Sequence, residues 1–313
     1  MQDFSLKEAL FAAFYQYREV EPDSHIYVLL DLNHPVAVHH PLHLDRLLQR
    51  EAARSIEIVR RPDLAHEAEL CPRLVQLYRA GEHGYVDEEL VSLTLECAFQ
   101  RCQSLNGAYV AAWIVSPEEP QQLSKRLASV NVTFDVRMGK QRHMPLFEPY
   151  RTALVVARFA PDSLKAWMGS STHWLYADIA GQLQVIDAPR AETPWIPLRL
   201  SREHFAAMER IHQARFALKA LANSDAVPRK QPELSIDNAV RQAHEWGLSH
   251  TEDVVLFVLN DFTVGPAWSS HPASMDAIQH AARGEGRLSD AMEALPDHSL
   301  ESIAEHAQRR APL

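Results

Sequence analysis

The sequence is short of glycine, of cysteine and of long apolar runs, and each shortage excludes a class of protein. Only 10 of the 313 residues are glycine, about half the usual frequency of ~7%, which leaves little material for the loops that cradle phosphates. The three cysteines form no Cys-x-x-Cys pair, so neither a disulfide framework nor a zinc knuckle is expected. No apolar run approaches the ~18 residues of a membrane span.

The charge balance is acidic, with 31 Lys and Arg against 41 Asp and Glu and a formal net charge of -10. Nucleic acid is therefore not expected as a partner, because such partners select basic surfaces. Asp3, Lys7 and Glu8 stand where a signal peptide would carry a basic region and then an apolar stretch. Together with the cysteine usage, these features predict a soluble, cytoplasmic protein with no membrane partner.

Apolar patterning predicts an α/β lobe, a mixed sheet with flanking helices, followed by an all-α lobe. Residues 108–115 are continuously apolar between Gly107 and Pro117, which is typical of a strand buried on both faces at the centre of a sheet. Further strands are predicted at residues 25–32, 56–59, 74–78, 132–136, 143–147, 174–179 and 182–186. Helices are predicted at residues 5–18, 42–54, 88–105 and 119–129, and another helix begins at Pro149.

A proline-rich segment, residues 187–197, is predicted to link the two lobes. It carries three prolines in eleven positions, a spacing that forbids a regular helix or a central strand. We therefore predict the α/β lobe over residues 1–190 and the helical lobe over residues 198–313, with Trp195 at their seam. Amphipathic patterns in the second lobe predict helices near residues 205–221, 236–246, 252–262, 274–283 and 299–309.

A histidine cluster is the strongest candidate for chemistry, because imidazoles can ligate transition metals. It consists of His34, His39, His40 and His43. However, Pro41 interrupts the helical register between the last two, and no His-Glu-x-x-His pattern accompanies them. Solvent-exposed histidines in a loop or at a helix start are the default interpretation, and a metal-dependent enzyme that uses the cluster is an alternative.

Two other candidates would supply nucleophiles. Gly169-Ser170-Ser171 lacks the second glycine of a Gly-x-Ser-x-Gly elbow and follows a helix instead of a strand, so it is interpreted as a turn. Cys71 precedes Pro72 with no base assigned to it, and a single cysteine of this kind is more often a small buried apolar residue. We predict that the chain is not an enzyme and that it has no cofactor and no catalytic or metal site.

Four segments, in this order and spacing, resemble one known family. They are HIYVLLDLNHP (residues 25–35), CPRLVQL (71–77), LFEPYRTALVV (146–156) and HWLYADIAGQLQVI (173–186). The family is that of type VI secretion system effector chaperones and adaptors. Its members typically show a strand ending in Leu-Asp, a Pro-x-Leu-Val stretch, and a strand that leads into Asp-Pro-Arg at a helix start.

The residues that match these motifs are interpreted as structural. At the third motif this chain has glutamate in place of aspartate, and its arginine is displaced by one position. The helical tail, with LRLSREHFAAME over residues 198–209, resembles the family's C-terminal lobe. The matching positions are Leu30, Asp31, Pro72, Leu74, Val75, Glu148, Pro149 and Arg151.

The resemblance implies a bacterial adaptor that binds a toxic effector and docks it on the tip of the valine-glycine repeat spike protein, without catalysis and without a cofactor. It assigns no residue of this sequence to either partner, and it does not say which lobe binds which. An immunity protein that neutralises a toxin remains an alternative, because it too requires only a binding surface.

Overall fold

The computed structural model describes residues 2–50, 55–104, 107–135, 137–188, 196–222 and 231–309. The chain forms two compact units, Met1–Arg202 and Glu203–Leu313, and each is described by itself. The first unit ends at Arg202, beyond the predicted linker, and within that linker the backbone N–H of Ile196 donates to the carbonyl of Ala166 at 3.0 Å. Trp195 and the first two prolines of the linker lie outside the described residues, and the predicted place of Trp195 with them.

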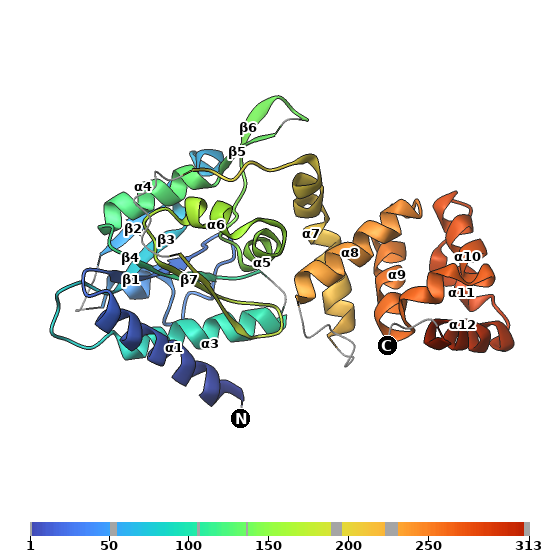
Figure 1. The fold of residues 1–313 in the computed structure, drawn as a ribbon, viewed down its shortest axis with the longest axis horizontal. Coiled ribbons are helices and arrows are strands. Elements are labelled where there is room, and N and C mark those ends of the chain that lie inside the picture. Colours follow the sequence, from blue (N-terminus) through green and yellow to red (C-terminus); the bar gives the residue numbers. More distant parts are fainter. Residues whose placement is uncertain are drawn as a thin grey trace. The chain divides into compact units, whose positions relative to one another are not determined.

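The first unit is built on a six-stranded sheet with the order β2-β3-β1-β4-β7-β8 (Figure 1). Every residue of β4 is buried, and β4 lies beside β1 in the middle of the sheet, as its continuous apolar sequence predicts. The strands are β1 (His25–Leu30), β2 (Ile56–Ile58), β3 (Arg73–Tyr78), β4 (Val110–Ser116), β7 (His173–Ala177) and β8 (Leu183–Asp187).

Each pairing in this sheet is antiparallel, so the sheet is not mixed as the sequence predicted. The reason is that helices cover both of its faces. An antiparallel strand enclosed in this way carries the same unbroken apolar sequence as a parallel one, and strand direction leaves no mark on the pattern. The broader prediction, an α/β lobe followed by an all-α lobe, is confirmed.

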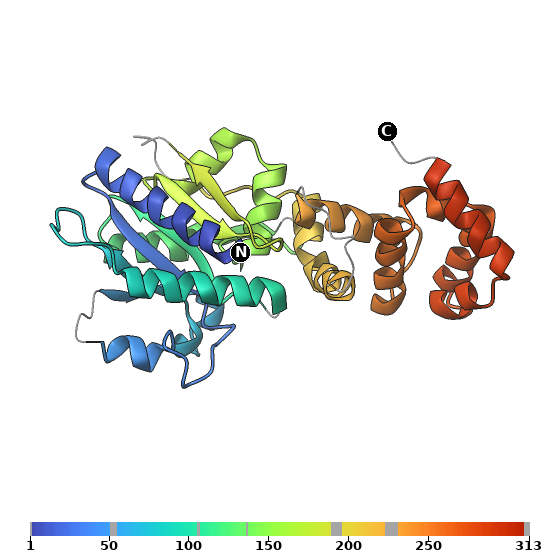
Figure 2. The same ribbon diagram turned by 90° about the horizontal axis from the view of Figure 1, so that it is seen from below.

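Two helices, α1 (Gln2–Val20) and α3 (Glu88–Ser104), lie across one face of the sheet (Figure 2). Phe14 of α1 and Leu95 of α3 belong to the same apolar core as Val28 and Trp113 of the central strands. The opposite face carries α4 (Pro120–Val130), α5 (Pro149–Arg158) and α6 (Pro161–Met168). The short elements α2 (Leu44–Leu48), η1 (Pro62–Leu64) and η2 (Ala68–Leu70) connect β1 to β3 around β2.

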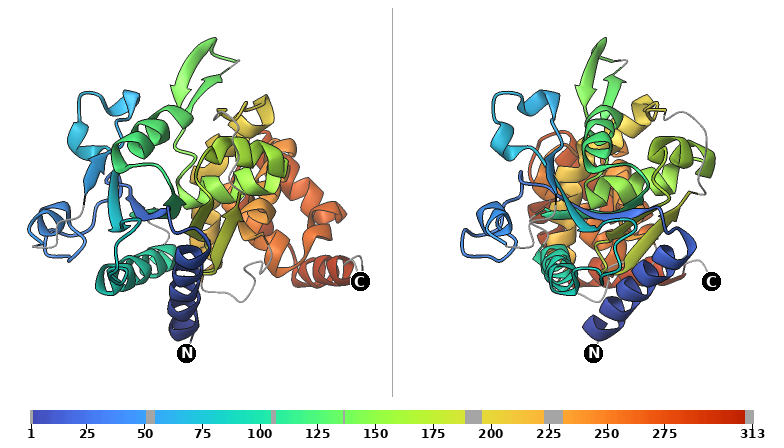
Figure 3. Two further views of the ribbon diagram at one scale, coloured as in Figure 1. Left: turned by 60° about the vertical axis from the view of Figure 1, so that its left-hand side comes forward. Right: turned by 90° about the vertical axis from the view of Figure 1, so that its left-hand side faces the viewer.

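A separate two-stranded sheet, β5 (Val132–Asp135) and β6 (Lys140–His143), stands out from this unit as a hairpin (Figure 3). The strand predicted at residues 143–147 is wrong, because β6 ends at His143. Beyond it the N–H of Leu146 donates to Oδ1 of Asn131 at 2.9 Å, and its carbonyl accepts from the Thr152 hydroxyl at 2.7 Å. Residues 144–147 therefore turn into α5 instead of extending the ladder.

The second unit is helical in its described part. Arg210 of α7 donates two hydrogen bonds to the buried carboxylate of Asp237 in α8, at 2.8 and 2.9 Å, which joins these two helices. Gly247, with a φ of 91°, follows the end of α8 as the sequence predicts. The elements are α7 (Arg202–Leu221), α8 (Pro232–Glu245), α9 (Thr251–Thr263), η3 (Pro266–Ser270), α10 (Pro272–Ala282), α11 (Leu288–Glu293) and α12 (Asp297–Arg309).

Among the residues that the structure describes, no helix has both the length and the apolar character needed to cross a membrane.

Candidate interaction surface

The motif positions of the first two segments are neighbours across the sheet. Leu30 of β1 pairs with Arg73 of β3, and the preceding residue pairs of the same ladder include Leu29 with Leu74. Asp31 directly follows β1, and Pro72 directly precedes β3, so the two motifs end at the same edge of the ladder. Both motifs contribute to the core, because Leu30, Leu74 and the other apolar positions here are buried.

The third motif begins α5 and meets the first through charge. Glu148 is the N-cap of α5, Pro149 is its first residue, and the Glu148 carboxylate accepts from the backbone N–H of Arg151 at 3.2 Å. The glutamate therefore performs the capping that an aspartate would perform. The Arg151 guanidinium lies 3.5 Å from the same carboxylate, and this holds the displaced arginine against the cap.

Asp31 and Glu148 are buried acids, with 2% and 3% of their surface exposed. Burial raises the pKa of Asp31, the charges of His34 and Arg61 and the N–H of Asn33 lower it, and the nearby Glu148 raises it. Both carboxylates thus lie in one buried charge cluster with basic side chains around them, and such a cluster is stable only when its charges compensate one another.

Arg61 connects this cluster to the surface. Its guanidinium donates two hydrogen bonds to Asp63, at 3.2 and 2.7 Å, although Arg61 itself is buried. Its backbone N–H donates to Sγ of Cys71 at 3.5 Å. Cys71 is a buried free thiol, as its interpretation as a small buried residue predicts. Its sulfur accepts the N–H of Arg61, the residue before η1, so its role here is structural.

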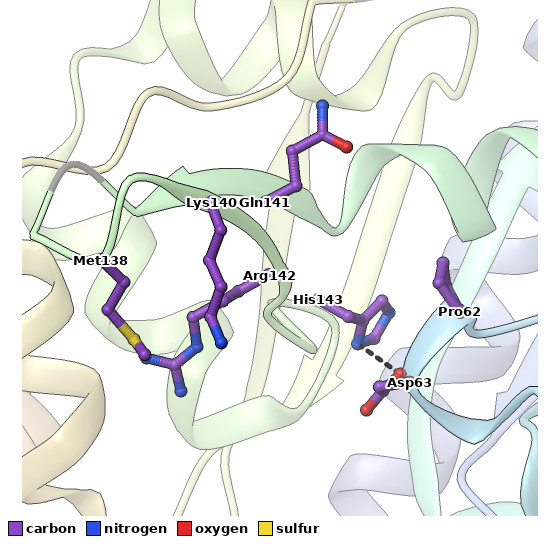
Figure 4. Close-up of a pocket in the computed structure, with 7 residues that line it drawn as sticks. All are labelled: Pro62, Asp63, Met138, Lys140, Gln141, Arg142 and His143. Carbon is purple, nitrogen blue, oxygen red and sulfur yellow. Dashed lines mark hydrogen bonds and ion pairs between the residues drawn. The ribbon is translucent and has the colours of Figure 1, made fainter.

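A hollow of about 610 Å³ opens between the η1 turn and the β5–β6 hairpin (Figure 4). It joins segments that are far apart in the sequence, because η1 precedes β3 and the hairpin follows α4. The lining residues are Pro62, Asp63, Met138, Lys140, Gln141, Arg142 and His143.

His143 forms the inner wall of this hollow. Its side chain is only 1% exposed, and Nδ1 lies 3.4 Å from Oδ1 of Asp63, without the geometry of a hydrogen bond. Burial lowers the pKa of His143 to about 4; the charges of Arg61 and Arg151 act in the same direction, and Asp63 opposes them. His143 is therefore neutral at neutral pH, and it lies beside the hollow and within the electrostatic reach of Arg61 and Arg151.

The hairpin itself exposes two large apolar side chains, Phe134 at 54% and Met138 at 53%. Its one carboxylate, Asp135, lies 3.2 Å from both Arg137 and Arg142. The side-chain hydrogen bond from Arg137 has the largest effect on the pKa of Asp135; burial opposes it, but the backbone N–H of Arg137 and the Arg142 guanidinium add to it, and the pKa falls to about 2. Lys140 is exposed and forms no ion pair with any described residue.

The histidine cluster of the sequence does not form a metal centre. Within the described ranges, no group of three or more His, Cys, Asp or Glu side chains is arranged to hold a metal ion. Nδ1 of His40 accepts from the N–H of Leu42 at 3.1 Å, and His43 caps α2. The ring of His34 packs against the backbone at Gly107, and His39 is exposed. Three of the four thus support local backbone structure.

The Gly169-Ser170-Ser171 turn follows α6, as predicted, and its hydroxyls belong to a structural clamp. Arg126 donates to Glu118 at 2.8 Å, to the carbonyl of Met168 at 2.6 Å and to the Ser171 hydroxyl at 2.5 Å. The Ser170 hydroxyl donates to the other oxygen of Glu118 at 2.5 Å. These hydrogen bonds join α4 to the end of α6.

Sequence reasoning missed the hollow and its residues Asp63, Lys140 and His143. A signal was present in the hairpin, where three Lys and Arg occur within the six residues 137–142 of an otherwise acidic chain. The contact between the hairpin and the η1 turn could not be predicted from the sequence, because that turn lies more than 70 positions earlier in the chain.

Comparisons of the chain with models of protein families, with curated proteins and with solved structures gave no match. The resemblance set out above therefore depends on the motif residues of the sequence alone.

Proposed function

We propose that the chain is a non-enzymatic, cytoplasmic adaptor that binds a type VI secretion effector and loads it onto the valine-glycine repeat spike protein. One observation carries the proposal. The three motifs, separate in the sequence, meet at one edge of the sheet, where β1 ends, β3 begins and α5 begins. A resemblance made of short motifs gains weight when the motif residues form one physical unit.

The location of that unit also supports a binding role. Arg61 acts electrostatically on both Asp31 of the buried cluster and His143, and His143 lines the open hollow beside the hairpin. Buried, mutually compensated charges fix the geometry of the residues around them. The hairpin beside this cluster exposes Phe134 and Met138, and these two side chains are available for apolar contact with a partner protein.

Affinity capture tests the proposal. The tagged chain is co-expressed with the spike protein and the effector encoded beside it, and the captured material is analysed for both. We expect both partners to be retained with the full chain. Failure to retain either one, with all three proteins expressed and folded, would overturn the proposal.

A second readout separates the adaptor from an immunity protein. Cells that express the effector's toxin domain are tested for survival with and without the chain. An adaptor binds the loading region of the effector and leaves the toxin active, whereas protection by the chain alone, without capture of the spike, would indicate a toxin-neutralising protein.

A further inference from the structure

The β5–β6 hairpin has backbone groups that no other strand bonds. The two strands pair only with each other in the described part of the chain, so the outer edge of each one faces away from a partner strand. An edge of this kind accepts an extended peptide through main-chain hydrogen bonds, and the side chains beside it select the peptide.

Polar atoms beside the hairpin also lack partners. Both ring nitrogens of His143 and Nη1 of Arg61 are buried without a hydrogen bond among the described residues. Unsatisfied buried polar atoms are rare and call for an explanation, because each costs free energy unless something bonds it. His143 lines the hollow (Figure 4), so its unsatisfied ring nitrogens lie close to the wall that a ligand in the hollow would contact.

The charges around the hollow favour an anion. The carboxylate of Asp135 is neutralised by Arg137 and Arg142, and that of Asp63 by Arg61. Lys140 then remains as an exposed cation with no ion pair in the described structure. This local excess of positive charge occurs in a chain of formal net charge -10, and attraction between opposite charges steers a partner to such a place.

We propose that an extended, acidic segment of a partner protein binds in this hollow, adding a strand to the hairpin edge and placing carboxylates beside Lys140. Apolar side chains of the segment contact Phe134 and Met138 at the same time. The inference rests on the proposed function, since it names the surface by which the adaptor holds one of its partners. A nucleic acid is not favoured, because its phosphate backbone would place many more negative charges against a chain of net charge -10 than a short acidic segment does.

The test uses two fluorescent decapeptides of alternating valine with glutamate or with lysine, and it measures anisotropy with the full chain at low salt. We expect the Glu-Val peptide to bind and the Lys-Val peptide not to bind. Raising the salt concentration should weaken the binding, because part of the attraction is screened. Equal binding of both peptides, or no binding of the Glu-Val peptide, would overturn the inference.

Charge reversal locates the site. In Lys140→Glu/Gln141→Glu, two exposed side chains change and the ion pairs of Asp135 remain. We expect Glu-Val binding to weaken by about tenfold or more and Lys-Val binding to appear. The matched control Lys219→Glu changes an exposed lysine of α7 and should leave both affinities within about twofold. Unchanged binding in the double variant would show that the hollow is not the site.

The two proposals fail separately. If the double variant loses the peptide but the full chain captures neither spike nor effector, the hollow binds acidic segments and the adaptor role is wrong. If the double variant captures both proteins as well as the natural chain does, the adaptor role stands and the hollow is not its contact.

Discussion

Nδ1 of His143 lies 3.4 Å from Oδ1 of Asp63, yet the two groups form no hydrogen bond, and the carboxylate instead accepts two from Arg61. The distance between His143 and Asp63 is that of an ion pair, but the two side chains form an ion pair only when the imidazole is protonated. Because burial and the charge of Arg61 lower the pKa of His143 to about 4, the contact carries no imidazolium at neutral pH.

Acidification should therefore destabilise the first unit through His143. The folded pKa of about 4 lies below the ordinary histidine pKa of 6.5, so the unfolded chain binds the proton more readily. The free energy of unfolding that His143 contributes is complete above pH ~6.5. It is lost as the pH falls toward ~4, and the loss is at most roughly 3 kcal/mol. Urea unfolding of the natural chain and of His143→Phe, measured between pH 7 and pH 5, should show a smaller pH dependence in the variant. The exposed His66→Gln serves as control, and equal slopes in all three would contradict the prediction.

Gly107→Ala should destabilise the chain. Gly107 has a φ of 90°, and an added Cβ would lie 2.4 Å from Nδ1 of His34, so backbone strain and a steric clash act together. We expect a loss of about 1 to 3 kcal/mol, measured by thermal or urea unfolding. Gly84→Ala is the matched control, because its Cβ would meet nothing within 4 Å. Adding His34→Ala should restore only the steric part of the loss.

Arg126→Lys should loosen the clamp between α4 and the end of α6. A lysine cannot reproduce three hydrogen bonds that leave one planar guanidinium toward Glu118, the Met168 carbonyl and the Ser171 hydroxyl. The expected loss of unfolding free energy is about 2 kcal/mol. The reverse exchange at the adjacent exposed residue, Lys125→Arg, should change the stability little. A stability of Arg126→Lys equal to that of this control would show that the clamp contributes nothing.

Asp261→Asn should stabilise the helical unit near neutral pH. Burial raises the pKa of Asp261 to about 6 from its ordinary value of 3.8, and its Oδ1 is buried without a hydrogen bond in the described structure. The folded state therefore favours the protonated acid, and stability is lost as the pH rises from ~3.8 through ~6. The amide avoids this loss, so the variant should gain roughly 1 to 3 kcal/mol at pH 7.5 and almost nothing at pH 4. Asp276→Asn, on the exposed side of α10, provides the comparison, and a gain that does not depend on pH would count against this cause.

The fold was predictable from the sequence where a pattern has a single structural meaning. The apolar residues 108–115 correspond to the fully buried β4, and the proline at position 149 begins α5. Strand direction was not predictable, because helices on both faces of the sheet remove the alternation that distinguishes an antiparallel strand. The strand predicted at residues 143–147 failed because Asn131, a distant side chain, takes the backbone bond of Leu146.

The candidate site was predictable only in part. The motif residues Asp31 and Glu148 could be selected by resemblance, but their proximity depends on tertiary folding. The contact of His143 with Asp63 depends on a hairpin meeting a turn from a much earlier part of the chain. The four histidines near position 40 were candidates for metal ligands because they are close together in the sequence. In the structure, three of them contact or cap the backbone.

The way in which the hairpin is attached has a consequence for how such proteins can diversify. Asn131 is buried at its base, where its carbonyl accepts from the N–H of Met144 at 2.7 Å and its side chain donates to the carbonyl of Leu127 at 2.8 Å. Beyond that point the hairpin is held by the ladder of its two strands, by the Thr133 hydroxyl, which donates to the carbonyl of Leu198 at 3.4 Å, and by the approach of His143 to Asp63. The turn of the hairpin is in this respect a replaceable cassette: the residues between Asp135 and Lys140 can change in length and in sequence while the large sheet keeps its own register. Exchanging cassettes between related chains would then transfer the choice of partner without rebuilding the core.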